Sequence, residues 1–331
     1  AELLTLASTY TRSLGRDIPH QSNGFLAVGH QAEFFHPGVW VKNFMATQLA
    51  TATDCTPLNL IVDNDTVKTV TLALPRWSDA PQQVRLETLP FDTLANEIPA
   101  EEWRTHDPNT LAAFSRHFQE ASQKWNFVPI WQQVWPSFIE FLAQGQPMVE
   151  ALTRVRVTTE AKWGAKNLEL PVSQLSASRA FIHFAQHLLA HAAEFASVYN
   201  AAILHYRQRY RLRSRHHPAP LLAQVGDWLE TPFWAWTAHR PLREKVYVRK
   251  NEVRLGTEIY NNLSSFLAQG GKLRPRALTL TLFVRLALAE SFIHGIGGGK
   301  YDEVTDEIMQ QFFQTPAPSY AVISATLRLP F

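Results

Sequence analysis

The sequence predicts an α/β fold whose core is a parallel sheet, with a large helical insert and a small β-hairpin insert. Near its start, the apolar run "GFLAVG" (24–29) precedes a polar loop and a helical pattern over 39–52. The apolar, β-branched run "PLNLIVDND" (57–65) follows. A further short strand, "SFIHG" (291–295), precedes another helical pattern near the end of the chain. Strand, helix and strand in this order are typical of a parallel crossover, so we expect elements from both ends to share one sheet.

The middle of the chain is expected to be helical. Asp107 is a good amino-terminal cap, and Pro108 in the first turn lacks an N–H that the helix would not use. Apolar residues at near-heptad spacing predict one long helix from Ala177 to Arg209. This helix would pack against another one, either within the chain or in a homodimer.

The pattern then changes from helical to alternating. "PFWAWT" and "EKVYVRKNEVRL" flank turn residues and predict a small β-hairpin. We expect Pro275 to open a helix, a glycine loop "IGGGK" to follow the strand "SFIHG", and the closing segment 319–331 to form a strand. The chain is therefore divided into 1–105 and 261–331 as the two parts of the core, 106–215 as the helical insert and 216–260 as the small β insert.

Composition narrows the classes of function. The formal net charge of the 331 residues is +2, so any binding of a polyanion must depend on a local patch. Cys55 is the single cysteine, which excludes an internal disulfide and favours a reducing, cytoplasmic compartment. No apolar run approaches the roughly 20 residues of a membrane span, and the opening residues lack the pattern of an export signal. We therefore expect no membrane association.

The first candidate site is the loop "GHQAEFFHPG" (29–38). At the carboxyl edge of a parallel sheet such a loop lies beside the amino end of a helix, which favours an anion such as phosphate. His30 and His36 carry the side chain that changes charge near neutral pH, so either could donate a proton or bind phosphate. The alternative is a polar turn whose histidines merely cap the helix; the position in the first strand-helix loop favours function. The candidate ligand-binding residues here are Gly29, Gln31, Gly38 and, in the following helix, Lys42.

The second candidate is the acidic end of the next strand. Asp63 and Asp65 are two residues apart, so they are expected to project from the same side of the chain. The pair could bind magnesium through oxygen ligands, a ribose or an amine. The alternative is a turn in which these side chains hydrogen-bond their own backbone.

The third candidate is "HGIGGGKYDE", a glycine loop expected at the head of a helix. Such a loop exposes several N–H groups, so it is a candidate cradle for phosphate or carboxylate. It matches neither the dinucleotide-binding pattern nor the P-loop. The candidate residues are Gly295, Gly297, Gly298, Lys300 and, from the basic segment just upstream, Arg274.

An arginine stretch, "YRQRYRLRSRHH", is the most basic part of the chain, with an arginine at every second position over 207–215. A nucleic-acid interface would need more basic surface than this nearly neutral chain offers. We expect a solvated helix end, with arginines that complement the helix dipole, and favour this interpretation over a nucleic-acid interface.

Four segments resemble the cysteine-adding enzymes of bacillithiol biosynthesis. "GFLAVGHQAEFFHPGVWVKNFMATQLA" is similar to that family's first strand, glycine-glutamine loop and helix, and "PLNLIVDND" to its next strand and acidic cluster. "LRPRALTLTLFVRLALAESFIHGIGGGKYDE" is similar to its Arg-Pro helix, strand and glycine loop, and "PAPSYAVISATLRLP" to the strand after them. The order and approximate spacing agree from about Gly24 to Pro330.

The resemblance implies a Rossmann-like core, a nucleotide pocket, and amide formation between cysteine and a glucosamine malate conjugate. Glu33 in place of a glycine and Lys300 within the third loop depart from the family pattern, which favours a relative with another acceptor. By position the resemblance assigns to the site His30, Gln31, Gly38, Asp63, Asp65, Gly297, Gly298 and Lys300.

We therefore expect a ligase or transferase that acts on a small molecule carrying phosphate or carboxylate, with ATP or ADP and magnesium as candidate cofactors. His30 or His36 would carry the proton, and Asp63 with Asp65 would orient an amine or a metal ion. Two alternatives stay open. One is a non-catalytic module that binds a small ligand, and the other is a nucleic-acid-binding protein that acts through residues 207–215.

Overall fold

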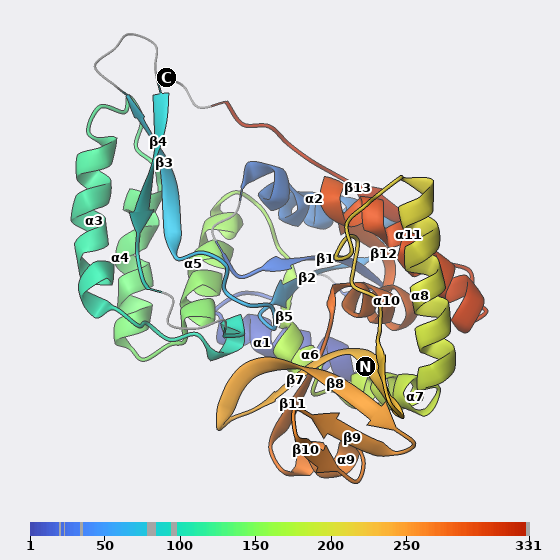
Figure 1. The fold of residues 1–331 in the computed structure, drawn as a ribbon. Coiled ribbons are helices and arrows are strands. Elements are labelled where there is room, and N and C mark those ends of the chain that lie inside the picture. Colours follow the sequence, from blue (N-terminus) through green and yellow to red (C-terminus); the bar gives the residue numbers. More distant parts are fainter. Residues whose placement is uncertain (20, 23, 34–35, 78–83, 94–97, 329–331) are drawn as a thin grey trace.

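A five-stranded parallel sheet with the order β13-β12-β1-β2-β5 forms the centre of the molecule (Figure 1). The computed structural model describes residues 1–19, 21–22, 24–33, 36–77, 84–93 and 98–328. The predicted α/β class is confirmed. The strands of this sheet are β1 (Phe25–Gln31), β2 (Thr56–Val62), β5 (Leu168–Pro171), β12 (Ala289–His294) and β13 (Tyr320–Val322).

Helices cover both faces of this sheet and form much of the insert. They are α1 (Glu2–Ser13), α2 (Pro37–Thr53), the 3-10 helix η1 (Ala100–Glu102), α3 (Pro108–Ser122), α4 (Ile130–Ala143), α5 (Met148–Lys162), α6 (Val172–Leu175), α7 (Arg179–Ala190), α8 (Ala192–Arg209), α9 (Leu263–Ala268), α10 (Ala277–Ala287) and α11 (Ile296–Phe312). In the described part of the chain, no helix combines the length and the apolar character needed to cross a membrane.

β1 lies between β2 and β12, so the two ends of the chain share one sheet as expected. Alternate side chains of β1 point to opposite faces. Leu26 and Val28 pack with Ala46 and Ala50 of α2. Ala27 belongs to a larger cluster on the other face, together with residues of α8 and α11. The crossover helices α2 and α11 therefore cover opposite faces, and the chain reverses its winding direction between β1 and β12.

β5 is a strand that the sequence did not predict. It lies within the segment 106–215, which we expected to be a helical insert, and it pairs with β2 in the central sheet. Its four residues are all buried, and a run this short has no clear period in the sequence.

α3, α4 and α5 form a helical layer beside the sheet, together with an antiparallel hairpin of β3 (Thr71–Trp77) and β4 (Val84–Pro90) (Figure 1). An aromatic cluster that includes Phe114, Trp135 and Phe138 holds this layer together. Asp107 caps α3 as predicted, because its Oδ1 accepts hydrogen bonds from the backbone N–H groups of the second and third helical residues.

The helix predicted from Ala177 to Arg209 is two helices, α7 and α8. His191 lies between them with φ −112° and ψ 30°. Its backbone N–H donates to the carbonyl oxygen of His187 at 3.2 Å, and its ring Nδ1 lies 2.9 Å from the same oxygen. The apolar stripe continues across this break, so the spacing of apolar residues did not reveal it.

The β insert is larger than the predicted hairpin. It is a six-stranded sheet of β6 (Gln224–Val225), β7 (Trp228–Thr237), β8 (Arg240–Arg249), β9 (Glu252–Leu255), β10 (Glu258–Tyr260) and β11 (Gly271–Pro275). β11 pairs antiparallel with β7, so the sheet extends past residue 260. Pro275 ends this strand and does not open a helix, and α10 begins at Ala277.

The glycine loop predicted after β12 is the first turn of α11. The helix begins at Ile296, directly after Gly295, so Gly297 and Gly298 are helical. Gly299 shows why a small residue is needed, since a Cβ atom there would lie 2.3 Å from Cγ2 of Val322 in β13. β13 itself ends at Val322, and residues 329–331 of the predicted closing strand lie outside the described residues.

Replacing Phe181 with Ala should lower the free energy of unfolding by about 3–5 kcal/mol. Phe181 of α7 is fully buried, and its ring packs edge-on against Phe233 of β7 and Phe283 of α10. The substitution would therefore leave a cavity where both sheets and α10 meet. Urea denaturation measures the change. Leu204→Ala, at a side chain 50% exposed on α8, is the matched control and should cost less than about 1 kcal/mol.

Candidate functional site

The carboxyl-terminal edge of the central sheet gathers polar side chains from segments far apart in the sequence. β1, β2 and β12 are parallel, so the residues that follow them lie at the same edge. Gln31 ends β1, and its Nε2 donates a hydrogen bond of 3.0 Å to Oδ2 of Asp65, just after β2. Two of the three predicted segments are therefore in direct contact.

His30 is held in its neutral form. It belongs to β1, where it pairs with Ile61 of β2. Gly29 and Gln31 are also residues of β1, so the prediction that these three residues lie in a loop was wrong. Burial lowers the pKa of His30 to about 4, and the positive charge of Lys42 acts in the same direction. A group that stays uncharged down to this pH is a poor proton carrier near neutrality.

Lys42 is directed into the protein, toward β1. Its Nζ donates to the carbonyl oxygen of Gly29 at 2.9 Å, and the side chain is buried. Burial lowers the pKa of Lys42 to about 8. Lys42 therefore places a partly desolvated charge beneath the site.

His36 caps α2, in agreement with the alternative interpretation that the histidines of this loop cap the helix. Its Nδ1 accepts a hydrogen bond of 3.0 Å from the backbone N–H of Gly38. This leaves Nε2 as the ring nitrogen that can carry a proton, on a residue exposed at the opening of the site. Gly38 allows the close approach of the carboxyl-terminal segment, since a Cβ atom there would lie 2.9 Å from the carbonyl oxygen of Ala325.

Asp63 and Asp65 have different surroundings. Asp63 is buried and accepts two hydrogen bonds from Ser173 of α6, one from the backbone N–H at 2.9 Å and one from Oγ at 2.5 Å. Burial and the negative charge of Glu101 raise the pKa of Asp63 to about 7. This carboxyl group is a structural anchor beneath the edge of the sheet.

Asp65 faces the site. Besides Gln31, it binds Arg243 of β8, whose Nη1 lies 2.7 Å from Oδ1, and Lys68, whose Nζ lies 3.3 Å from Oδ2. Burial alone would raise the pKa of Asp65, but the Gln31 hydrogen bond and the two cations lower it below the usual value. Asp65 is therefore an ionised acceptor at neutral pH.

Arg274 has a structural partner. It lies in β11, and its Nε and Nη2 donate to the two carboxylate oxygens of Glu101 at 2.7 and 2.9 Å. The backbone N–H of Glu101 in turn donates to the carbonyl oxygen of Asp63. Arg274 thus ties the β insert to the segment after β2, away from the glycines with which we had grouped it.

The third predicted segment contributes little to the site. Gly295 is the amino-terminal cap of α11 and has no side chain to offer a ligand, while Lys300 is exposed on α11. Asp302, the seventh residue of the helix, is buried and binds Arg285 and His294, each at 2.7 Å. The contribution of α11 to the site is Tyr301.

Two cavities flank the contact between Gln31 and Asp65. The first, the hairpin cleft, has a volume of about 440 Å³ and lies between the sheet edge, the β3 hairpin and the helical layer. The polar residues of its lining include Gln31, Glu33, His36, Asp65 and Lys68. Both signs of charge are therefore present in one opening.

The second cavity, the α10 pocket, has a volume of about 290 Å³ and lies between the same sheet edge, the amino end of α10 and the β insert. The residues that define it here are Gln31, Asn64, Asp65, Trp234, Arg243 and Arg276. Gln31 and Asp65 line both cavities, so the two cavities adjoin at this hydrogen-bonded pair.

Sequence reasoning missed most of the α10 pocket. Trp234 and Arg243 come from adjacent strands of the β insert, and Tyr199 from α8. In the sequence, the tryptophan and the arginine fit an ordinary hairpin. Asn64 and Arg276 did stand in the segments singled out, between the two aspartates and beside Arg274, but only the packing of the β insert on the sheet distinguishes them.

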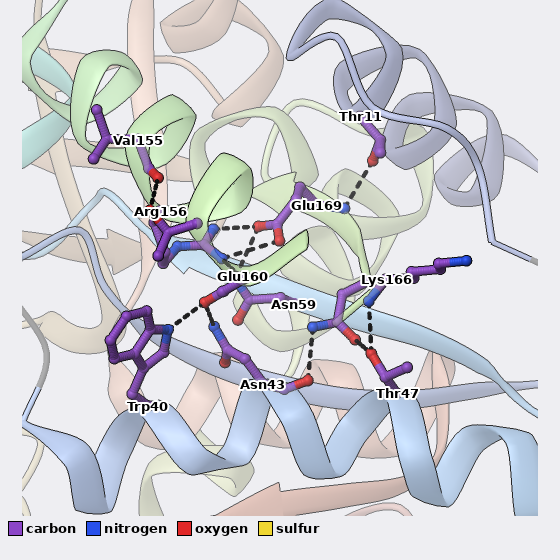
Figure 2. A network of polar contacts seen from close by, with 12 residues as sticks. Thr11, Trp40, Asn43, Thr47, Asn59, Val155, Arg156, Glu160, Lys166 and Glu169 are labelled. Atoms are coloured by element: carbon purple, nitrogen blue, oxygen red, sulfur yellow. Dashed lines mark hydrogen bonds and ion pairs between the residues drawn. The ribbon is translucent and has the colours of Figure 1, made fainter. Parts of the chain in front are cut away.

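A buried network of polar contacts joins the helical layer to the core (Figure 2). Arg156 of α5 donates to Glu160 at 2.7 Å and, with both terminal nitrogens, to Glu169 of β5 at 2.5 and 3.1 Å. Trp40 and Asn43 of α2 donate to the other oxygen of Glu160. These contacts hold α2, α5 and β5 together.

The arginine stretch makes internal contacts at its helical end. α8 ends at Arg209, and Arg207 donates to the carbonyl oxygens of Arg215, His217 and Ala219. Arg209 lies 3.5 Å from Glu303. Arg207 therefore supports the turn after α8, and Arg209 links α8 to α11.

Within the residues described, no group of three or more His, Cys, Asp or Glu side chains could hold a metal ion. No protein-family model matches the chain, and no curated protein sequence matches it significantly.

Replacing Asp63 with Asn should remove one component of the pH dependence of stability. The pKa of Asp63 in the folded protein is about 7, against an ordinary value of 3.8, so the folded state keeps a proton that the unfolded state has lost. The stabilisation by this proton is complete below pH 3.8 and is lost as the pH rises to about 7. Asn resembles the protonated form at every pH.

Urea unfolding of both proteins at intervals from pH 5 to pH 8 is the measurement. The wild-type protein should lose stability relative to Asp63→Asn as the pH rises. Titration of groups that do not interact with Asp63, such as His30, cancels in this difference. A difference that is constant with pH would contradict the assignment.

Proposed function

We propose that the protein is a ligase or transferase that joins two small molecules at the carboxyl-terminal edge of the sheet, one of which carries a phosphate or carboxylate group. One observation carries the proposal: the hydrogen-bonded pair of Gln31 and Asp65 lines both cavities. A reaction between two substrates needs two binding sites that meet at one point. The two cavities meet this requirement with an amide and an ionised carboxylate at the junction.

The location of the cavities supports this proposal. Open parallel sheets bind ligands outside the carboxyl ends of their strands, where the winding direction reverses. Here that reversal lies between β1 and β12, because α2 and α11 cover opposite faces. Gln31 is the last residue of β1, directly at this position.

The hairpin cleft suits the anionic part of a substrate such as ATP or ADP. Its volume lies within the range of about 300–1,000 Å³ that is common for small-molecule sites. The exposed Lys68 can meet phosphate oxygens. Mg²⁺ is usually held by one or two carboxylates together with the phosphates of its nucleotide. Asp65 is the carboxylate placed to share an ion that arrives in this way.

The residues at the junction have separate roles in the proposed reaction. His36 is the proton carrier, through Nε2. Gln31 and Asp65 orient an attacking amine or hydroxyl group by accepting its hydrogen bonds, and the surrounding cations stabilise negative charge as it develops. The similarity to the cysteine-adding enzymes of bacillithiol biosynthesis suggests amide formation, with an acceptor that remains to be identified.

A thermal-shift screen with ATP, ADP, nucleotide sugars and inorganic phosphate, each with and without magnesium, should identify a stabilising ligand. A ligand at 100 times its dissociation constant stabilises the folded protein by about 2.7 kcal/mol, which shifts the melting temperature measurably. In the variant Asp65→Asn, the stabilisation by nucleotide with magnesium should fall more than the stabilisation by nucleotide alone. Stabilisation by single-stranded RNA, and by none of the nucleotides, would favour the nucleic-acid-binding alternative instead.

The substitution His36→Asn should abolish most of the turnover of the ligand so identified while leaving its binding intact. Asn is among the best helix caps, so this variant keeps the hydrogen bond to α2 and loses only the imidazole. A positioned general acid or base contributes about 100-fold or more to the rate. Release of phosphate or of nucleoside diphosphate is the readout.

His36→Ala is the matched control for the helix cap. It lacks both the imidazole and the cap, so it should be less stable than His36→Asn by about 0.5–2 kcal/mol. Turnover by His36→Asn at the wild-type rate would remove His36 from the catalytic role. A wild-type protein that binds nucleotide without any turnover would instead favour the non-catalytic binding module.

A further inference from the structure

The amino end of α10 opens into the α10 pocket without a side-chain cap. α10 begins at Ala277, and its capping residue, Arg276, makes no capping hydrogen bond through its side chain. The first backbone hydrogen bond of the helix runs from Leu280 to the carbonyl oxygen of Arg276. The N–H groups before Leu280 have no partner within the helix, and the helix dipole gives this end a partial positive charge. Ala277 and Leu278 line the pocket.

Arg276 adds a fixed guanidinium group at the same place. Its side chain is 6% exposed, and it lies over the ring of Trp234, with Cζ 4.3 Å from the ring centroid. Nη1 lies 2.8 Å from Oε1 of Glu230, and Nε donates to the carbonyl oxygen of Phe233. Nη2 has no hydrogen-bond partner among the described residues, although it is buried. Arg276 therefore retains donor capacity on the wall of this pocket.

Asn64 adds an unused acceptor. Its side chain is 4% exposed, and Nδ2 donates to the carbonyl oxygen of Pro275 at 2.8 Å. Its buried Oδ1 accepts no hydrogen bond from any residue that the structure describes. Buried polar atoms are nearly always paired, and both of these atoms belong to residues that line the α10 pocket, where a small molecule could pair them.

The charged residues of the lining leave a net positive charge in the α10 pocket. They are Asp65, Arg243 and Arg276, one acidic and two basic. Asp65 is already engaged by Arg243 at 2.7 Å. Arg276 is ion-paired with the buried Glu230 through Nη1, so its Nη2 and the amino end of α10 are the donors left for a ligand in this pocket.

We propose that the α10 pocket binds the anionic group, carboxylate or phosphate, of a small substrate. Arg276 and the amino end of α10 bind the anion, Asn64 accepts a hydrogen bond from a donor on the same molecule, and the rings of Trp234 and Tyr301 enclose its organic part. The identification of this molecule as one of the two substrates rests on the proposed function. The anion site itself does not. The ligand is a small molecule, since the cavity has a volume of about 290 Å³.

Fluorine NMR of protein labelled with 5-fluorotryptophan tests this site directly. The variant Trp234→Phe assigns the resonance of Trp234. Inorganic phosphate and succinate are titrated separately at constant ionic strength, and choline is the cationic control. At least one of the two anions should shift the Trp234 resonance in a saturable manner, and choline should not. The anion that does so tells whether the pocket prefers phosphate or carboxylate.

Ala277→Glu and Ala277→Gln form the matched pair of variants. A carboxylate in the first turn of a helix is favourable for folding, so Ala277→Glu should fold normally while its charge competes with the anion. Its dissociation constant for the anion should rise at least about tenfold, the effect of losing one charge-assisted interaction. The Gln side chain is nearly the same size as Glu but carries no charge. The dissociation constant of Ala277→Gln for the anion should therefore lie within about threefold of the wild-type value.

The inference is overturned if neither anion shifts the Trp234 resonance, or if Ala277→Glu binds as tightly as Ala277→Gln. These outcomes are independent of the proposed function, which depends on the nucleotide screen and on His36 in the other cavity. If nucleotide binds and neither anion shifts the Trp234 resonance, the proposed ligase or transferase function would still hold, and the proposed anion site would be wrong. A saturable shift of Trp234 without any nucleotide effect would support the anion site alone.

Discussion

The cluster of Arg156 with Glu160 and Glu169 determines how the layers of this protein fit together. One guanidinium group binds a carboxylate on its own helix and another on β5, and Asn43 and Asn59 complete the hydrogen bonding of these oxygens (Figure 2). Burial raises the pKa of Glu169, an effect that the charge of Arg156 opposes. Removal of one partner from such a group leaves a buried charge uncompensated, at a cost of about 3–5 kcal/mol. The cluster therefore holds α5 against the sheet, and Leu152 of the same helix lines the hairpin cleft.

The β insert is held on the other side by similar chemistry. Arg274 binds Glu101, and Arg243 binds Asp65, so two strands of the insert are tied to the segment that follows β2. Asp65 also accepts the hydrogen bond from Gln31, so the junction of the two cavities shares a residue with one of these attachments.

The histidines and aspartates show how far local pattern reaches into function. Three of the residues singled out in the sequence, Gln31, His36 and Asp65, line the hairpin cleft. It assigned His30 and Asp63 the same importance as their neighbours, yet burial makes His30 neutral and turns Asp63 into an anchor for α6. Adjacent side chains of a strand point to opposite faces of the sheet. The sequence of the strand does not show which of these faces is buried by other elements. That depends on helices more than 100 residues away.

The sequence alone determined the elements that local pattern encodes: the βαβ unit around α2, the cap of α3 at Asp107, and the meeting of both chain ends in one parallel sheet. Tertiary structure alone decided that β5 joins that sheet, that Gly297 and Gly298 are helical, and that Arg276, Asn64 and Trp234 line one cavity. The physical reason is range. Propensity, capping and apolar period act over a few residues, whereas a pocket forms where distant surfaces exclude water from between them, and no local pattern records that contact.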